Sequence, residues 1–280
     1  MSGIGIEILQ LFKAPVTAKA FELFARFINN KSPSMMQTVA KRFDQLLESH
    51  HLNGAELLSL IPPAWGWNLS TVENSIQISK ALQAEYFSWF AKTFQVNESW
   101  LNGSEELAVA HFGGYKHLET LGTTLREDGW VNDELKMTIL SEEYAGQNAP
   151  LGRYAIVFSK PIAELDREKT IYKHVLFEPV WQWDHLPCRL ETKAIARWYS
   201  MILMQFGIIS IIPVKRKEFE QLIKRKTLPG KFITLESGGY DHFEVRVLNP
   251  TESQQTIEVE EIDAVIEHLE HCGFLEAIHG

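Results

Sequence analysis

The segment FAKTFQVNESWLNG, residues 90–103, closes a run of helix-patterned segments that begins near residue 38. Apolar side chains recur at helical spacing up to Phe94, so they share one face of a helix. Asn97 then follows as a candidate N-cap for a short helix, and Gly103 is placed to end it. We therefore expect one helix to end at Phe94 and a shorter helix to follow it.

Three more helices are expected upstream of this segment. Apolar positions at helical spacing predict a first helix at residues 36–50. Asn53 is a candidate cap for a second helix at 55–60, which ends before two consecutive prolines. Residues 64–68 are expected to form a turn. The third and fourth helices are predicted at residues 71–78 and 82–94, with Ser70 as a candidate cap for the third.

Together these segments resemble the helix-turn-helix module of the lambda-repressor-like (XRE) family over residues 36–103. The resemblance implies that the second helix crosses the DNA backbone and that the third, residues 69–77, enters the major groove. Asn and Gln side chains can form two hydrogen bonds to adenine, and Ser or Thr can bond base edges or phosphates. The implied base-contacting residues are Asn68, Ser70, Thr71, Asn74 and Gln77, and the implied phosphate-contacting residues are Lys41 and Arg42.

The charge and aromatic content of this region leave a second function open. Between residues 51 and 91 the only Lys or Arg is Lys80, whereas contacts to phosphate usually need a cation. The link between the second and third helices also contains Trp65 and Trp67. The alternative is a protein that retains the helix-turn-helix fold but binds a protein or senses a small ligand instead of binding DNA.

The length of 280 residues fits about two domains. We expect a helical lead-in at 1–35, the helix-turn-helix domain at 36–110, and an effector or dimerisation domain at 111–280. In this last domain strands and helices do not alternate regularly, which predicts an α+β fold. Strands are expected at 153–159, 171–180, 208–213 and 257–259, a hairpin at 232–248, and helices at 116–127, 189–206, 215–226 and 261–272.

The net charge of −9 is unevenly distributed. Residues 189–231 contain ten basic and three acidic residues, whereas the last thirty residues contain eight acids and no Lys or Arg. This asymmetry fits a basic binding face beside an acidic one, or two solvated helix faces that neutralise each other. If residues 215–226 form one helix, their two basic triplets lie at its ends on opposite faces.

Aromatic residues of the second domain offer a candidate ligand pocket. Phe177, Trp181 and Trp183 would line it, with Arg189 as its polar group. Core packing explains the same aromatic residues more simply. Asp184 and His185 lie beside them, which keeps an enzyme as a third alternative, but no Ser or Cys nucleophile motif accompanies this pair.

The sequence predicts no catalytic residue, metal or cofactor. His185 and Cys188 have the spacing of half a zinc site, but nothing shows that they meet His268, His271 and Cys272. No apolar run approaches the ~20 residues that cross a bilayer, and two cysteines are consistent with a reducing cytoplasm. We therefore expect a cytoplasmic regulator without a signal peptide or membrane partner, which binds double-stranded DNA as a homodimer and responds to a small-molecule or protein effector.

Overall fold

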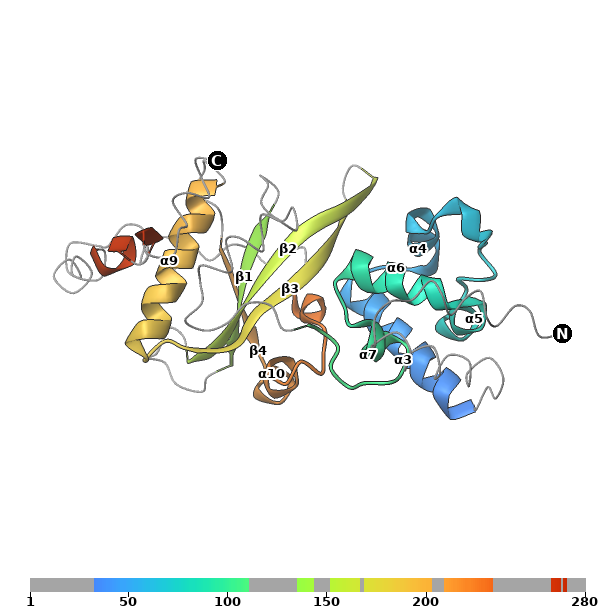
Figure 1. Ribbon diagram of the computed structural model, residues 1–280, viewed down its shortest axis with the longest axis horizontal. Coiled ribbons are helices and arrows are strands. Elements are labelled where there is room, and N and C mark those ends of the chain that lie inside the picture. The colour runs from blue at the N-terminus through green and yellow to red at the C-terminus, as the bar shows by residue number, and fades with distance from the viewer. Residues whose placement is uncertain are drawn as a thin grey trace, which may run out of the picture. The chain divides into compact units, whose positions relative to one another are not determined.

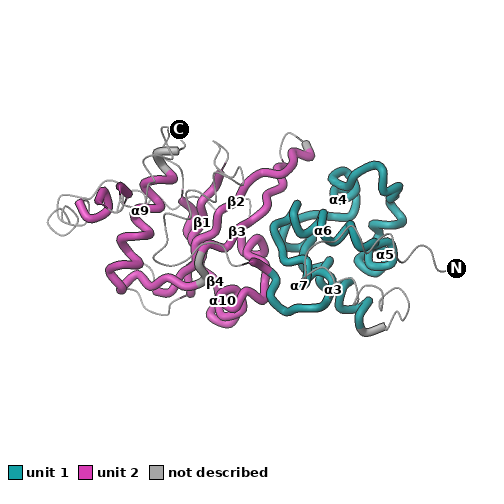
Figure 2. Tube along the Cα trace, in the orientation of Figure 1, with its two compact units in different colours: residues 1–108 teal, residues 109–280 magenta. Residues whose placement is uncertain are grey.

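The computed structural model describes residues 33–110, 135–143, 152–166, 169–202, 209–233, 263–267 and 269–270. The chain divides into two compact units, residues 1–108 and 109–280 (Figure 2). The sequence placed this boundary after residue 110. The described part of the first unit is helical, and the second unit combines helices with a mixed sheet, so the fold is α+β as predicted.

The first unit contains the helices expected from the sequence, with one of them displaced (Figure 1). The displaced helix is the third, which begins at Ser75 rather than at residue 71. The expected lead-in helix lies outside the described residues. The elements are α3 (Pro33–Ser49), α4 (Gly54–Leu60), the 3-10 turn η1 (Pro63–Trp65), α5 (Ser75–Ala81), α6 (Ala84–Phe94) and α7 (Glu98–Leu101).

The core of the first unit is built from one apolar stripe per helix. Phe43 of α3 meets Phe90 of α6 edge to face, with ring centroids 4.9 Å apart. Burial of each such side chain contributes about 2 kcal/mol, which the short helices need because they are marginal in isolation. The same core contains Val39, Leu46, Leu57, Ile78, Phe87 and Leu101, all buried.

The second unit is organised around a four-stranded sheet in the order β3-β2-β1-β4. Neighbouring strands pair antiparallel except β1 and β4, which are parallel. Strands expected at 153–159 and 171–180 are present and are longer than predicted. The strand β1 was not predicted. The strands are β1 (Lys136–Glu142), β2 (Arg153–Asp166), β3 (Lys169–Gln182) and β4 (Ser210–Val214).

Helices cover the sheet, and strand alternation separates the side chains of its two faces. On one face Met137, Tyr154 and Phe158 pack with α9 (Leu186–Ile202) in a single cluster. On the other face Arg153 lies over the ring of Phe219 in α10 (Arg216–Ile223), which is followed by the turn η2 (Pro229–Phe232). Residues 137–140 of β1 and 154–159 of β2 are therefore buried on both faces.

Several expected elements lie outside the described residues. These are the helix at 116–127, residues 234–248 of the expected hairpin and the strand at 257–259. The first hairpin residue, Phe232, is described and ends the turn η2 instead of beginning a strand. Of the last predicted helix, residues 263–267 and 269–270 are described, and they are helical. In the described residues no helix has both the length and the apolar character needed to cross a bilayer.

Candidate functional site

The start of α4 is fixed by a reciprocal pair of hydrogen bonds, in which Asn53 is the N-cap that the sequence predicts. The Asn53 Oδ1 accepts from the Glu56 backbone N–H at 3.0 Å, and the Glu56 Oε2 accepts from the Asn53 N–H at 2.8 Å. This capping box satisfies two of the helix's orphan donors. A Cβ on Gly54 would lie 2.1 Å from the Val72 carbonyl oxygen, so the absence of a side chain lets the segment before α5 approach α4 closely.

The connection between α4 and α5 spans residues 61–74, and it is much longer than a tight helix-turn-helix turn. It contains η1, which ends at Gly66 in the left-handed region with φ of 64°. Trp65 stacks on Tyr86 of α6, with ring centroids 3.8 Å apart and an interplanar angle of 19°. The ring of Trp67 also lies near that of Tyr86, with centroids 5.8 Å apart. The tryptophan-containing loop is thus held against α6.

Because of local side-chain hydrogen bonds, the third helix begins further along the chain than predicted. The Asn68 Oδ1 accepts from the Thr71 N–H at 3.2 Å, and the Thr71 Oγ1 accepts from the Asn68 N–H at 3.3 Å. The Asn74 Oδ1 then accepts from the Gln77 N–H at 3.0 Å, which makes Asn74 the N-cap of α5. Short polar side chains compete with helical hydrogen bonds in this way. The prediction of a helix from residue 71, capped by Ser70, is therefore wrong.

The helix α5 packs one face on α3 and exposes the other. Its inward side chains, Ser75, Ile78 and Ser79, are buried. On the outward face Lys80 is exposed and Gln77 is half-buried, and Ile76 is 50% exposed. Together with Asn74 at the cap, these side chains form what we call the α5 face: Asn74, Ile76, Gln77 and Lys80.

The structure brings together only some of the predicted base-contacting residues. Asn74 and Gln77 lie in the cap and first turn of α5. Asn68 and Thr71 form a separate turn in the preceding connection, which also contains the exposed Ser70. The sequence analysis missed Ile76 and Lys80. The spacing of buried Ser75, Ile78 and Ser79 is the signal that would have identified them as outward-facing.

The two predicted phosphate-contacting residues differ in their surroundings. Lys41 is exposed on α3. Arg42 is half-buried: its Nη1 donates to the Trp100 carbonyl oxygen, and its Cζ lies 5.6 Å from the Trp100 ring centroid. Burial lowers the pKa of Arg42, against the opposing effect of Glu106. Arg42 therefore joins α3 to α7, and a phosphate contact would have to displace that hydrogen bond.

The first unit has few cations. Residues 33–110 contain four Lys or Arg residues and eight Asp or Glu residues. Six of the acids are exposed: Asp44, Glu48, Glu73, Glu85, Glu105 and Glu106. Because phosphate contacts supply most non-specific affinity for DNA, this unit alone provides little of that affinity.

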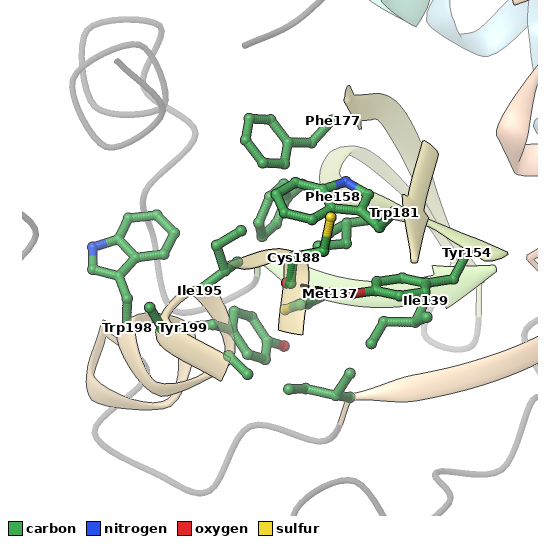
Figure 3. Close-up of a cluster of buried hydrophobic side chains, with 14 of the residues drawn as sticks. Met137, Ile139, Tyr154, Phe158, Phe177, Trp181, Cys188, Ile195, Trp198 and Tyr199 are labelled. Atoms are coloured by element: carbon green, nitrogen blue, oxygen red, sulfur yellow. Dashed lines mark hydrogen bonds between the residues drawn. The ribbon is translucent and has the colours of Figure 1, made fainter. Parts of the chain in front are cut away.

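The predicted ligand pocket of the second unit lies in the hydrophobic core. Phe177 and Trp181 have no exposed surface, and their ring centroids are 5.8 Å apart (Figure 3). Trp183 is partly buried against the same cluster, and the Arg189 Nη1 donates to its carbonyl oxygen at 3.0 Å. These are core contacts that a ligand would have to displace, so the packing alternative accounts for these residues.

The remaining candidate residues do not form a reaction site within the described part of the chain. Asp184 and His185 are exposed in the turn before α9, and Cys188 is buried in the core. Among the described residues no group of three or more His, Cys, Asp or Glu side chains is arranged to hold a metal ion. His268, His271 and Cys272 lie outside the described residues.

Comparison of the chain with known protein families, curated proteins and solved structures found no match.

Proposed function

We propose that this protein is a DNA-binding transcription regulator whose α5 face contacts base edges in the major groove. The observation that supports this proposal best is the division of α5 into a buried face on α3 and an outward face with Ile76, Gln77 and Lys80. A recognition helix needs this arrangement, because one side must be held rigidly while the other enters the groove.

The side chains of the α5 face suit different parts of a base pair. The Gln77 amide can form a bidentate pair with adenine, Ile76 can contact the methyl group of thymine, and Lys80 can bond guanine or a phosphate. The Asn74 oxygen is already engaged in capping α5, so Asn74 can offer only its amide N–H groups without uncapping the helix. Gln77 is therefore the residue that we assign to adenine contact.

A regulator with so few cations near its recognition helix needs more than one copy of it. We propose that the protein acts as a homodimer in the cytoplasm, with the second unit serving dimerisation or the sensing of an effector. Two linked modules raise the overall affinity without new contacts within each module. A dimer would also require two half-sites spaced about 34–36 Å apart, one turn of DNA.

The test is an unbiased selection of duplexes by the full-length protein at about 50 mM salt, where phosphate contacts are strongest. We expect enrichment of a two-fold symmetric site, and loss of that enrichment with Gln77→Ala. The matched control is Gln37→Ala, which removes an exposed glutamine from α3 and should leave the selected site unchanged. Absence of enrichment with the wild-type protein would overturn the proposal.

A second function, protein binding through the same unit, is favoured by one specific observation. Leu69 is 65% exposed in the connection before α5, where Trp65 and Trp67 are half-buried. Exposed apolar side chains grouped in this way are typical of protein interfaces. In that case the selection would enrich no sequence, while Leu69→Ser would weaken self-association measured by sedimentation. Unchanged sedimentation of Leu69→Ser would contradict this second function.

A further inference from the structure

The strongest concentration of positive charge in the described residues surrounds α10. Residues 209–233 contain seven Lys or Arg residues and two Glu residues. We call the exposed members of this group the α10 basic surface: Lys215, Arg216, Lys217, Lys224, Lys226 and Lys231. The position of α10 in the second unit is shown in Figure 1.

The end of α10 differs from the end predicted from the sequence, and this changes where the cations of the second triplet lie. The helix stops at Ile223 rather than at residue 226. The Lys226 N–H donates to the Gln221 carbonyl at 2.9 Å, and the Arg225 N–H donates to the Leu222 carbonyl at 2.8 Å. This is the Schellman pattern, in which the chain turns at a left-handed residue. That residue is Arg225, with φ of 58°.

One lysine from each basic triplet, Lys217 and Lys224, lies on the same side of α10. Lys217, Gln221 and Lys224 follow one another at i, i+4 and i+7, and all three are exposed. They therefore form one stripe along the outward side of α10. The inward side contains Phe219 and Leu222, which have no exposed surface.

The two acids of this segment pair with Arg153 and with two members of the surface itself, Lys224 and Lys231. The Glu220 carboxylate accepts from the Arg153 Nη2 at 2.6 Å, and its other oxygen lies 3.8 Å from the Lys224 Nζ. Glu218 pairs with Lys231 at 3.4 Å. Among the described residues, no carboxylate is within salt-bridge distance of Lys215 or Lys217. The surface therefore keeps an excess of positive charge.

The end of α10 contains a non-glycine residue in the left-handed region, Arg225, as the first unit does at His51 and Gln95. Such a residue costs about 1 kcal/mol, and glycine is the usual residue at this position of a Schellman motif.

We infer that the α10 basic surface binds the phosphate backbone of duplex DNA. The inference rests on the proposed function, because DNA is the polyanion that a regulator meets, and it supplies the phosphate contacts that the acidic first unit lacks. A membrane surface is a poorer fit, since interfacial helices expose apolar side chains beside their cations. On α10 the apolar Phe219 and Leu222 are buried instead.

The test compares full-length variants in binding to a labelled duplex at 50 to 200 mM KCl. One variant combines Lys217→Gln with Lys224→Gln. The matched control combines Lys92→Gln with Lys136→Gln, which removes two exposed lysines elsewhere. Each phosphate contact adds about 0.9 to the slope of log K against log salt. We expect the slope to decrease by about 2 in the first variant and to stay unchanged in the control, with melting temperatures equal to that of wild type.

The outcomes separate this inference from the proposed function. If wild type prefers a selected site and the α10 variant keeps the full slope, the inference is overturned and the function stands. If wild type binds all duplexes alike and the α10 variant has a smaller slope, phosphate binding by the α10 basic surface is supported and the proposed function is contradicted. Absence of duplex binding at 50 mM KCl would overturn both. Poly-glutamate that competes as strongly as DNA of equal charge would identify an acidic protein as the partner instead.

Discussion

At the scale of single residues, small polar and glycine side chains determine where the α5 face lies. The Asn68–Thr71 turn and the Asn74 cap shift the helix start to Ser75. Helical periodicity cannot detect this shift, because Asn, Ser and Thr are compatible with both a helix and a capped turn. The Asn53 cap was predicted, whereas the reciprocal hydrogen bond from its partner Glu56 was not, although Glu56 follows at the spacing of a capping box.

Gly54 and Gly66 provide a matched pair for testing the close approach of α4 to the segment before α5. Gly54→Ala places a methyl group 2.1 Å from the Val72 carbonyl oxygen, so backbone must move. We expect it to lower the free energy of unfolding by about 2–3 kcal/mol. In Gly66→Ala the added methyl group has no atom within 4 Å. We expect this change to lower the free energy of unfolding by only about 1 kcal/mol, because residue 66 has a left-handed φ. Equal losses in urea denaturation would contradict this packing.

The buried His50 should make stability depend on pH. Burial lowers its pKa from 6.5 to about 4, despite the hydrogen bond to the Leu46 carbonyl. The unfolded chain therefore binds a proton at a higher pH than the folded chain does. Stability is full above about pH 6.5 and decreases as pH falls toward 4, by about 3 kcal/mol in total. Unfolding of His50→Gln should lack this part of the pH dependence, whereas His51→Gln should retain it.

At the scale of elements, the sequence predicted helices with one buried stripe well and missed the central strand β1. The helix α6 ends at Phe94, as its apolar spacing indicates. The strand β1 was missed because residues 137–140 are all buried. It lies between β2 and β4 and is covered on both faces, so its sequence lacks the polar alternation by which a half-exposed strand is recognised.

The end of α10 offers a prediction at this scale. Arg225→Gly removes the cost of a left-handed non-glycine residue but increases the freedom of the unfolded chain. We expect a net gain of about 0.5 kcal/mol in the free energy of unfolding. Lys226→Gly removes the same charge at a residue without a positive φ, and it should give no gain. A loss of stability in Arg225→Gly would argue against the Schellman geometry.

At the scale of the whole molecule, charge is distributed unevenly along the chain. Residues 33–110 of the first unit contain twice as many acids as cations, whereas residues 209–233 of the second unit are strongly basic. The sequence analysis recognised the basic segment, contrasted it with the acidic last thirty residues and did not determine its role. Which cations are exposed depends on the length of α10 and on the ion pairs of Glu218 and Glu220, and neither is visible in composition alone.

The same scale explains why the ligand-pocket hypothesis arose. Phe177 and Trp181 are aromatic residues near a charged side chain, a pattern that pockets and cores share. Only the fold distinguishes the two cases, because it places Tyr154, Phe158 and Trp198 in the same buried cluster. The candidate DNA-contacting residues came from the family resemblance, and of the five expected on the third helix only Asn74 and Gln77 lie in the cap and first turn of α5.

The most direct test of the central proposal determines whether one side chain, Gln77, contacts one base pair. The affinity of wild type and of Gln77→Ala is measured for the selected duplex and for duplexes with each A·T pair replaced in turn. We expect one replacement to weaken wild-type binding by 1–3 kcal/mol and to leave Gln77→Ala unaffected. Equal discrimination by the two proteins at every position would contradict base contact by the α5 face.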